Sequence, residues 1–473
     1  MSELHELTAL EQAAAMRRRE VSPVQLLDHY LERIERLDSK LGAFLTLTPE
    51  LGRVQAREAE QAIRLEPDVE RLPPLLGVPV PIKDLTMVEG VRATLGSRAY
   101  AEFVAPYQDH VVTKIRAAGG VIPGKTNTPE FGLPCYTENA LSAPARTPWD
   151  LESSAGGSSG GAAAAVAGGL APLAHGNDGA GSVRIPASLC GLVGIKPSRN
   201  RISNGPVFSD ITGLVTHGPL ARTVRDAAAL LDAMSGAMPD DAVWAPAPGR
   251  TFLDHAESDP GRLRIGRFIT PVIAEAEIHP NCVAAYEQAS ALLEELGHEV
   301  EDIAPPFHPE LVPTFEKVWA VSSTLVPVDP ALEDRLLPLT RWLRERGRGV
   351  SGTGFAQALQ AMALASREWL RATGRYDAVL TPTLAQPPPR VGGIRDDDDP
   401  LGDFETQKRF TPFTAAYNIT GQPAISVPLH WNGAGVPVGV MLAGRPAAEA
   451  TLIALAAQLE TARPWAHRRP TTW

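Results

Sequence analysis

The chain has 473 residues, 44% of them hydrophobic, which is enough apolar material for a large buried core. Its formal net charge of -11 at pH 7 excludes the broad positive field that general nucleic-acid binding requires. The three cysteines, Cys135, Cys190 and Cys282, lie far apart and predict no disulfide framework, and no apolar run is long enough for a membrane span.

Several absences limit the class of protein further. The first residues, MSELHELTALEQ, lack the apolar stretch of a secretory signal, so we expect a cytoplasmic location. No histidine pair flanks a glutamate at the spacing of a metalloprotease helix, and no Cys-x-x-Cys occurs. We therefore predict no metal, no cofactor and no nucleic-acid or membrane partner. A monomer or a homodimer is expected.

Residues 1–70 are predicted to form a helical region. Apolar residues at helical spacing occupy 24–37, and a more polar helix is expected over 50–65. Ser22 precedes Pro23, a pair typical of a helix start, because serine caps free N–H groups and proline fits the first helical position.

An apolar run over 76–82 predicts a buried strand that ends directly before Lys83. The ordinary interpretation of such a lysine is a solvated strand end, and a chemical role would need partners from elsewhere. Residues 119–126 match the phosphate-loop pattern, which requires a preceding strand and a following helix. Here a helix is predicted over 111–118 and Pro129 follows closely, so nucleotide binding is not predicted.

The rest of the chain alternates between strands and helices, which predicts an α/β fold. The predicted strands are 121–123, 190–197, 263–266, 299–303, 376–382, 424–429 and 438–442. The predicted helices are 223–231, 280–297 and 447–460, with a less regular helical cover over 309–372. No internal repeat or linker is evident, so a single domain over 1–473 is expected.

Two serine clusters lie in glycine-rich sequence and are joined by a run of small residues that predicts a closely packed helix. The first cluster is GGSSGG at 156–161, and the second is NDGAGS at 177–182. Glycine allows backbone conformations that side chains forbid and lets a substrate approach main-chain N–H groups. The structural alternative is a pair of turns, in which glycine and serine are common.

Ser158 also fits G-x-S-x-G, the pattern of the α/β-hydrolase nucleophile elbow. An elbow needs a hydrophobic strand directly before the serine, whereas residues 149–154 are largely polar, and no His-Gly-Gly motif lies upstream. The elbow is therefore disfavoured. His175, beside the second cluster, is interpreted as a packed or exposed loop histidine without a chemical role.

A third interpretation joins both serine clusters to Lys83. Serine is a weak nucleophile that needs a base, and a lysine can be that base when burial lowers its pKa. In this hypothesis Lys83 takes a proton from Ser158, Ser158 takes one from Ser182, and Ser182 attacks a carbonyl. The N–H groups over Gly179 to Ser182 would stabilise the oxyanion, a contribution of about 3–4 kcal/mol per donor.

At these residues the chain resembles the amidase signature family, over nearly its whole length. The resemblance is strongest at 77–85, 124–130, 156–161 and 176–197. The intervals of 75 and 24 residues that separate Lys83, Ser158 and Ser182 match the family's catalytic relay.

The resemblance implies a role for each site residue. Lys83 would be the base, Ser158 a bridging serine that follows a cis peptide bond, and Ser182 the nucleophile. The implied oxyanion hole consists of the backbone N–H groups of Gly179, Ala180 and Gly181. The implied supporting residues are Ser159, Asp178 and Arg184.

The resemblance also implies a large mixed central sheet with helices on both faces and a catalytic core at 71–240. The implied reaction is hydrolysis of a small-molecule amide through an acyl-enzyme, without metal or cofactor. Hydrolysis of a carbamate (urethane) or an ester remains an alternative, as does a glutamine-dependent amidotransferase subunit. A binding protein without catalysis is the remaining class.

Two positions depart from the family pattern: Asn177 stands where many members have Thr or Ser, and Ala180 stands where many have Gly. The segment HGNDGAGSVRIPAS is similar to that of bacterial 6-aminohexanoate cyclic-dimer hydrolases, which open nylon-related lactams. We expect Asn127, Phe131 and Tyr136 to line the substrate site, on linear or cyclic amides or nylon-type oligomers.

Overall fold

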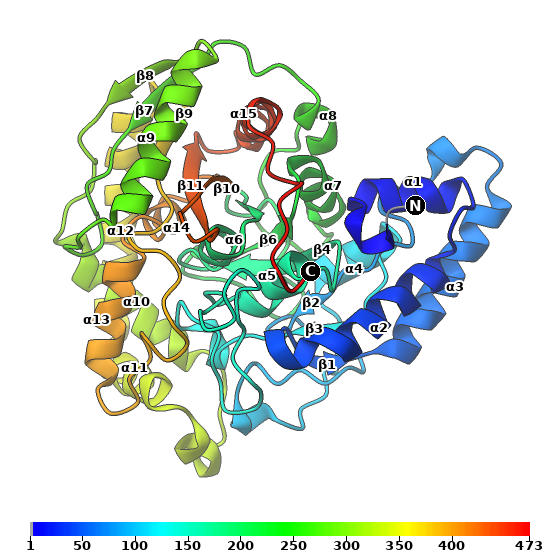
Figure 1. The fold of residues 1–473 in the computed structure, drawn as a ribbon. Helices are drawn as coiled ribbons and strands as arrows, with labels where there is room; N and C mark the ends of the chain where they lie inside the picture. Colours follow the sequence, from blue (N-terminus) through cyan, green and yellow to red (C-terminus); the bar gives the residue numbers. More distant parts are fainter. Residues whose placement is uncertain (1–2) are drawn as a thin grey trace.

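An eight-stranded mixed sheet forms the centre of the fold in the computed structural model, which describes residues 3–473 (Figure 1). The strand order is β4-β6-β5-β10-β11-β9-β7-β8. All pairs from β4 to β9 are antiparallel, and β7 runs parallel to both β9 and β8. The strands are β4 (Leu173–Asp178), β5 (Val193–Lys196), β6 (Thr216–Ala221), β7 (Arg264–Arg267), β8 (Glu299–Asp302), β9 (Ala378–Pro382), β10 (Ala424–Trp431) and β11 (Pro437–Gly444).

Helices cover both faces of this sheet, as the alternation of side chains along its strands requires. In β9, Ala378 and Leu380 join the core beneath α7 (Val224–Met234), α8 (Phe252–Ala256), α9 (Pro280–Glu295) and α15 (Glu449–Ala462). Val379, which points to the opposite face, joins the core beneath α10 (Leu311–Thr324), α11 (Pro338–Arg348), α12 (Gly352–Thr373), α13 (Pro400–Phe410) and α14 (Ala416–Ile419). The predicted α/β fold with a large mixed sheet is confirmed.

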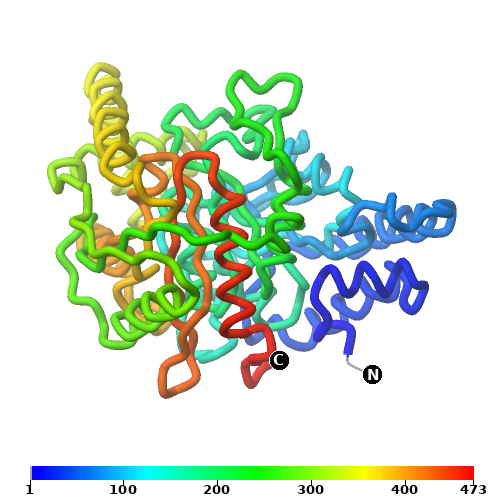
Figure 2. The backbone as a smooth tube through the Cα atoms, turned by 90° about the horizontal axis from the view of Figure 1, so that it is seen from above, coloured from blue at the N-terminus to red at the C-terminus, as the bar shows by residue number. Residues whose placement is uncertain are grey.

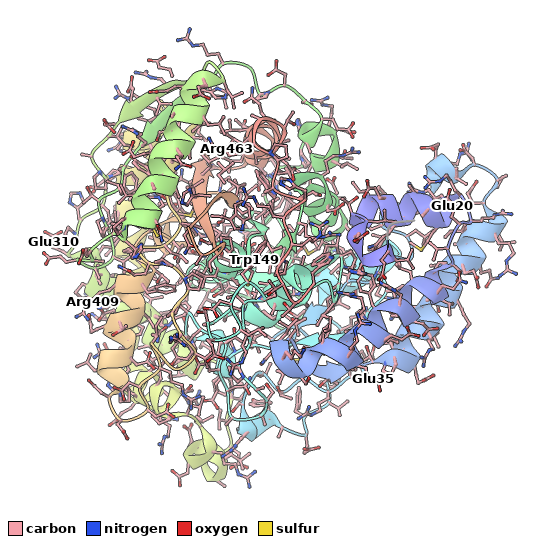
Figure 3. The ribbon with its side chains drawn as sticks, viewed as in Figure 1. Glu20, Glu35, Trp149, Glu310, Arg409 and Arg463 are labelled. Carbon is pink, nitrogen blue, oxygen red and sulfur yellow. The ribbon has the colours of Figure 1, made fainter. Side chains whose placement is uncertain are left out.

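The N-terminal helices lie at the opposite side of the molecule from α10, α11 and α13, and Figure 2 shows the same separation from above. They are α1 (Ala9–Arg17), α2 (Pro23–Leu41) and α3 (Pro49–Leu65). In Figure 3 the labelled Glu20 and Glu35 mark this side, and Glu310 and Arg409 mark the other. Among the described helices, none combines the length and the apolar character that a bilayer crossing requires.

A second, three-stranded sheet holds the first part of the site. Its order is β1 (Phe44–Leu47), β3 (Gly124–Thr126) and β2 (Ile82–Lys83), with β2 parallel and β1 antiparallel to β3. The predicted helical region 1–70 thus contains a strand. The strand expected over 76–82 is reduced to two residues, because Pro79 and Pro81 have no N–H to donate. Lys83 lies within the strand rather than after it.

Two further predictions around the second serine cluster need correction. The strand expected over 190–197 is shorter, because α6 (Arg184–Cys190) occupies its first residue and β5 begins only at Val193. Strands β4 and β6 were not predicted, since His-Gly-Asn-Asp and His-Gly-Pro have low strand propensity. The glycine at position 218 in β6 has a packing reason, because a Cβ there would clash with the backbone of Ile195 in the neighbouring strand.

Helix α5 (Gly160–Ala167) consists only of Gly, Ala and Val and is entirely buried between the two sheets. Its small residues let the backbones of its neighbours approach closely. A Cβ added to Gly161 would lie 2.6 Å from the carbonyl oxygens of both Ala43 and Asn127. The helix that carries the first serine cluster is therefore fixed against the β1 and β3 region by backbone contact.

We predict that Gly161→Ala lowers the free energy of unfolding by about 1–3 kcal/mol, because the added methyl group overpacks rigid backbone. Urea unfolding measures the change. Gly352→Ala at the start of α12 is the matched control, since an added Cβ there meets nothing within 4 Å. Equal stability of the two variants would contradict this packing argument.

Candidate active site

The side chain of Lys83 is fully buried and ends among three oxygen atoms. Its Nζ lies 2.8 Å from Ser158 Oγ, 3.0 Å from Ser159 Oγ and 2.6 Å from Asn177 Oδ1. Removal from water lowers the pKa of Lys83 well below its ordinary value, and the charge of Asp178 opposes this shift only in part. The site therefore favours the uncharged amine.

The two serine clusters meet through their backbones. The peptide bond between Gly157 and Ser158 is cis, and the N–H of Ser159 donates to the carbonyl oxygen of Ser182 (3.1 Å). The Ser182 side chain lines a cavity, and within residues 3–473 its hydroxyl has no hydrogen-bond partner. Thus Lys83 and Ser158 are in direct contact, whereas Ser182 lies beside them with a free hydroxyl.

A buried ion pair shapes the loop that follows β4. Arg184 Nε and Nη2 donate to the two carboxylate oxygens of Asp178, at 3.0 and 2.9 Å, and both side chains have no exposed surface. Burial alone would raise the pKa of Asp178, but the Arg184 charge and hydrogen bonds hold it well below its usual range. The carboxylate also accepts from the backbone N–H groups of Gly181 (2.7 Å) and Val183 (3.2 Å).

The hydrogen bonds of this loop to the Asp178 carboxylate change the set of backbone N–H groups that are free to bind an oxyanion. The N–H of Gly181 is already donated to Asp178, so it is not free to bind a substrate oxygen. In the described part of the chain, the N–H groups of Gly179 and Ala180 have no acceptor. Asn418 Nδ2 donates to the carbonyl of Asp178 (3.0 Å). In a trans peptide bond the N–H points in the opposite direction to the C=O, so the N–H of Gly179 points away from Asn418.

Sequence reasoning missed two residues that hold this loop, both from the segment around α14. Thr414 Oγ1 donates to the carbonyl of Ala180 (2.6 Å), and Asn418 Oδ1 accepts from Arg184 Nη2 (2.7 Å). The local signal was weak, but polar residues in the otherwise apolar segment 412–421 could have indicated buried hydrogen-bonding roles.

His175 lies on β4, fully buried behind Lys83, rather than in a loop. Its Nδ1 accepts from the backbone N–H of Lys83 (3.3 Å), so its proton resides on Nε2, which donates to His217 Nδ1 (2.9 Å). Burial lowers the pKa of His175 well below its usual value and that of His217 to about 4. Both rings are therefore neutral and add no positive charge next to Lys83.

A cavity opens at Ser182, and its wall is mainly apolar. It is lined by Leu133, Pro134, Cys135, Ala180, Ser182, Ile185, Ile273, Phe315, Trp319, Phe404, Gln407, Lys408, Thr411 and Ala415. Within the described residues, no group of three or more His, Cys, Asp and Glu side chains is arranged to hold a metal ion.

The three residues expected to line the substrate site do not line this cavity. Asn127 Nδ2 donates to the carbonyls of Gly42 and Ala143, which makes it a connector between loops. The Tyr136 hydroxyl donates to Asp403 (2.6 Å), and Phe131 packs in a separate hydrophobic cluster. The cavity wall comes instead from their neighbours at 133–135 and from α10 and α13.

Comparison with known proteins gives matches over nearly the whole chain. The family model described as Amidase matches residues 25–453. The chain is 36% identical over 491 residues to the 6-aminohexanoate-cyclic-dimer hydrolase of Paenarthrobacter ureafaciens, covering 98% of this chain and 96% of that one. It is 34% identical to the acylamidase of Rhodococcus erythropolis, covering 99% and 98%. A solved 6-aminohexanoate cyclic dimer hydrolase superimposes with a TM-score of 0.91 at 33% identity, with complete coverage of both chains.

Asp178→Asn is predicted to lower the free energy of unfolding by about 3–5 kcal/mol, because it leaves the Arg184 charge buried without its partner. Urea unfolding monitored by circular dichroism gives this value. The control is Asp302→Asn, whose ion pair with Arg267 is exposed and should contribute about 1 kcal/mol or less. Similar losses in the two variants would argue against a structural role for the buried pair.

Proposed function

This chain belongs to the amidase family and hydrolyses carbon–nitrogen bonds other than peptide bonds, and on that premise we propose a serine amidase with Lys83 as base. Ser158 relays the proton, and Ser182 is the nucleophile that forms an acyl-enzyme. The observation that carries the proposal is the 2.8 Å contact between Lys83 Nζ and Ser158 Oγ, together with the complete burial of the Lys83 side chain. Small-molecule amides, linear or cyclic, are the proposed substrates.

An inventory of protons supports the direction of the relay. A neutral amine has two N–H groups and one lone pair. Asn177 Oδ1 can only accept, so it takes one N–H. Ser159 Oγ donates its own proton to the carbonyl of Asn177 (3.1 Å), so it accepts the second N–H. The lone pair of Lys83 is left for Ser158, whose hydroxyl must then donate.

This inventory gives Asn177 and Ser159 a positioning role. Ser159 Oγ also accepts from the N–H of Asn177 (3.3 Å), which completes its capacity of one donated and two accepted hydrogen bonds. Neither residue reacts. Together they orient the amine so that its only free electron pair faces the serine that must be deprotonated.

In the proposed acylation, proton transfer accompanies both the attack of Ser182 and the loss of the amine. The Ser182 hydroxyl rotates toward Ser158, gives up its proton to the relay and attacks the amide carbonyl carbon. The N–H groups of Gly179 and Ala180 stabilise the oxyanion in the proposed hole. As the C–N bond breaks, the proton returns through Ser158 to the amine that leaves. Water then gives a proton to the relay and attacks the acyl carbonyl carbon. The bond from that carbon to Ser182 Oγ breaks, the proton returns through Ser158 to Ser182, and the carboxylic acid is released.

Ser182→Ala is expected to reduce the kcat for an anilide by roughly 10⁶-fold, because the nucleophile is lost. Ser258→Ala, a serine of the loop after α8, serves as the control and should retain wild-type turnover. A fluorophosphonate probe should label the wild type and the control but not Ser182→Ala. A loss of less than about tenfold in Ser182→Ala would refute the assignment of the nucleophile.

The kcat/KM of the wild type is predicted to fall as the pH drops through the pKa of Lys83, because the ammonium cannot accept a proton. Asn177→Asp places a carboxylate where Oδ1 now lies 2.6 Å from Nζ, which favours the ammonium and raises the pKa of Lys83. Its acidic limb should therefore move to higher pH.

The pH–rate profile measures this shift, with Asn432→Asp in the hairpin turn between β10 and β11 as the remote isosteric control. The other ionisable groups around the amine are Asp178, His175 and His217. In the wild type the pKa of Asp178 lies well below its usual range and burial lowers the pKa of both histidines, so none of the three titrates near neutral pH. A flat wild-type profile, or an Asn177→Asp variant with lower activity but an unmoved limb, would contradict the proposed base.

A further inference from the structure

The wall of the cavity at Ser182 offers a substrate mostly hydrocarbon. Six of its residues have large apolar side chains, namely Leu133, Ile185, Ile273, Phe315, Trp319 and Phe404. The rings of Phe315 and Trp319 stack with their centroids 5.7 Å apart, so one side of the cavity is an aromatic surface. Such a surface binds alkyl, alicyclic or aryl groups by burying their apolar area.

Two polar side chains that line the cavity, Gln407 of α13 and Thr411 directly after this helix, already have partners within the protein. Gln407 Nε2 donates to Asp403 (2.7 Å), and its Oε1 accepts from the N–H of Cys135 (2.9 Å). Thr411 Oγ1 donates to the carbonyl of Gln407 (2.9 Å). Because these groups are engaged on the protein side, they are poorly placed to compensate the desolvation of a charged substrate group.

Lys408, the lysine in this wall, pairs with two carboxylates, and Arg346, 3.7 Å from Glu316, balances the second of these negative charges. Its Nζ contacts Glu316 and lies 2.7 Å from Glu405, and it stands over the ring of Phe404 at 5.6 Å. A substrate carboxylate that approached Lys408 would also meet both glutamates, and a substrate ammonium would meet Lys408 itself. Two further residues of the wall, Ser182 and Trp319, have polar groups, a hydroxyl and an indole N–H, and neither group is charged.

We propose that this cavity binds the acyl side of the amide and accepts an uncharged, apolar acyl group while rejecting the same chain with a charged end. This inference rests on the proposed function of Ser182. It narrows the substrate to alkyl, cyclic or aryl amides without charge. Amides whose acyl chain ends in an ammonium or a carboxylate are therefore poor substrates.

Three anilides with the same chain length test the proposal, namely the hexanoyl, 6-aminohexanoyl and adipoyl anilides, which end in methyl, ammonium and carboxylate. The kcat/KM of the hexanoyl anilide should exceed each of the other two by at least about tenfold, because the cavity has no free counter-charge. A charged anilide that equals or exceeds the hexanoyl anilide would overturn the proposal.

Ser182→Ala separates this proposal from the proposed function. If Ser182→Ala abolishes turnover of all three anilides and a charged one is preferred by the wild type, only the substrate class is wrong. If Ser182→Ala retains turnover, the nucleophile is wrong. The cavity is then tested by competition, in which hexanamide should inhibit more strongly than adipic acid monoamide, and the reverse order would overturn the substrate class.

A charge variant tests the role of the glutamates directly. Glu405→Gln removes one of the two carboxylates that pair with Lys408, so the adipoyl anilide should gain severalfold in kcat/KM relative to the hexanoyl anilide. Glu58→Gln in α3, where the carboxylate pairs with Arg116 at the surface, is the control and should leave the ratio unchanged. An unchanged ratio in Glu405→Gln would overturn the argument that the pairing of Lys408 sets the selectivity.

Discussion

The burial of one amine among neutral oxygen atoms is the constraint on which the rest of the site depends. Lys83 Nζ meets no carboxylate at hydrogen-bonding distance in the described residues, only Ser158, Ser159 and Asn177. Desolvation therefore dominates its pKa. Three distant parts of the chain have to converge for this: strand β2, the start of helix α5 and the end of strand β4. The small residues of α5 make that convergence possible, because they let both sheets approach the same helix.

A second constraint concerns Asp178, the charge that raises the pKa of this amine against the effect of burial. Asp178 follows Asn177 directly, and without Arg184 its carboxylate would be a buried, unpaired charge. The pair with Arg184 compensates that charge. The same carboxylate accepts from the N–H of Gly181, whereas the N–H groups of Gly179 and Ala180 have no acceptor among residues 3–473. Residues of the α14 segment complete the arrangement from the other side. The proposed base and the proposed oxyanion donors are therefore positioned by one connected network.

The sequence predicted the parts of this site that depend on motifs. Glycine-flanked serines, with the family resemblance at their intervals from Lys83, predicted the contact between Lys83 and Ser158, and alternating elements predicted the α/β fold. The sequence could not identify contacts made by tertiary packing: Asn418 and Thr414 lie more than 200 residues from the loop they hold. Strand β4 was missed because its burial, not its propensity, makes it a strand. The residues that line the cavity at Ser182 could not be identified from the sequence for the same reason, and Tyr136, which was expected at the substrate site, instead donates its hydroxyl to Asp403.

The most direct test of the central claim is the titration of Lys83 itself by nitrogen or side-chain carbon NMR, with its signal assigned by its loss in Lys83→Met. The account predicts a midpoint well below the ordinary lysine value of 10.5, coincident with the acidic limb of the pH–rate profile. A midpoint at the ordinary value, with an ammonium present throughout the active pH range, would contradict it.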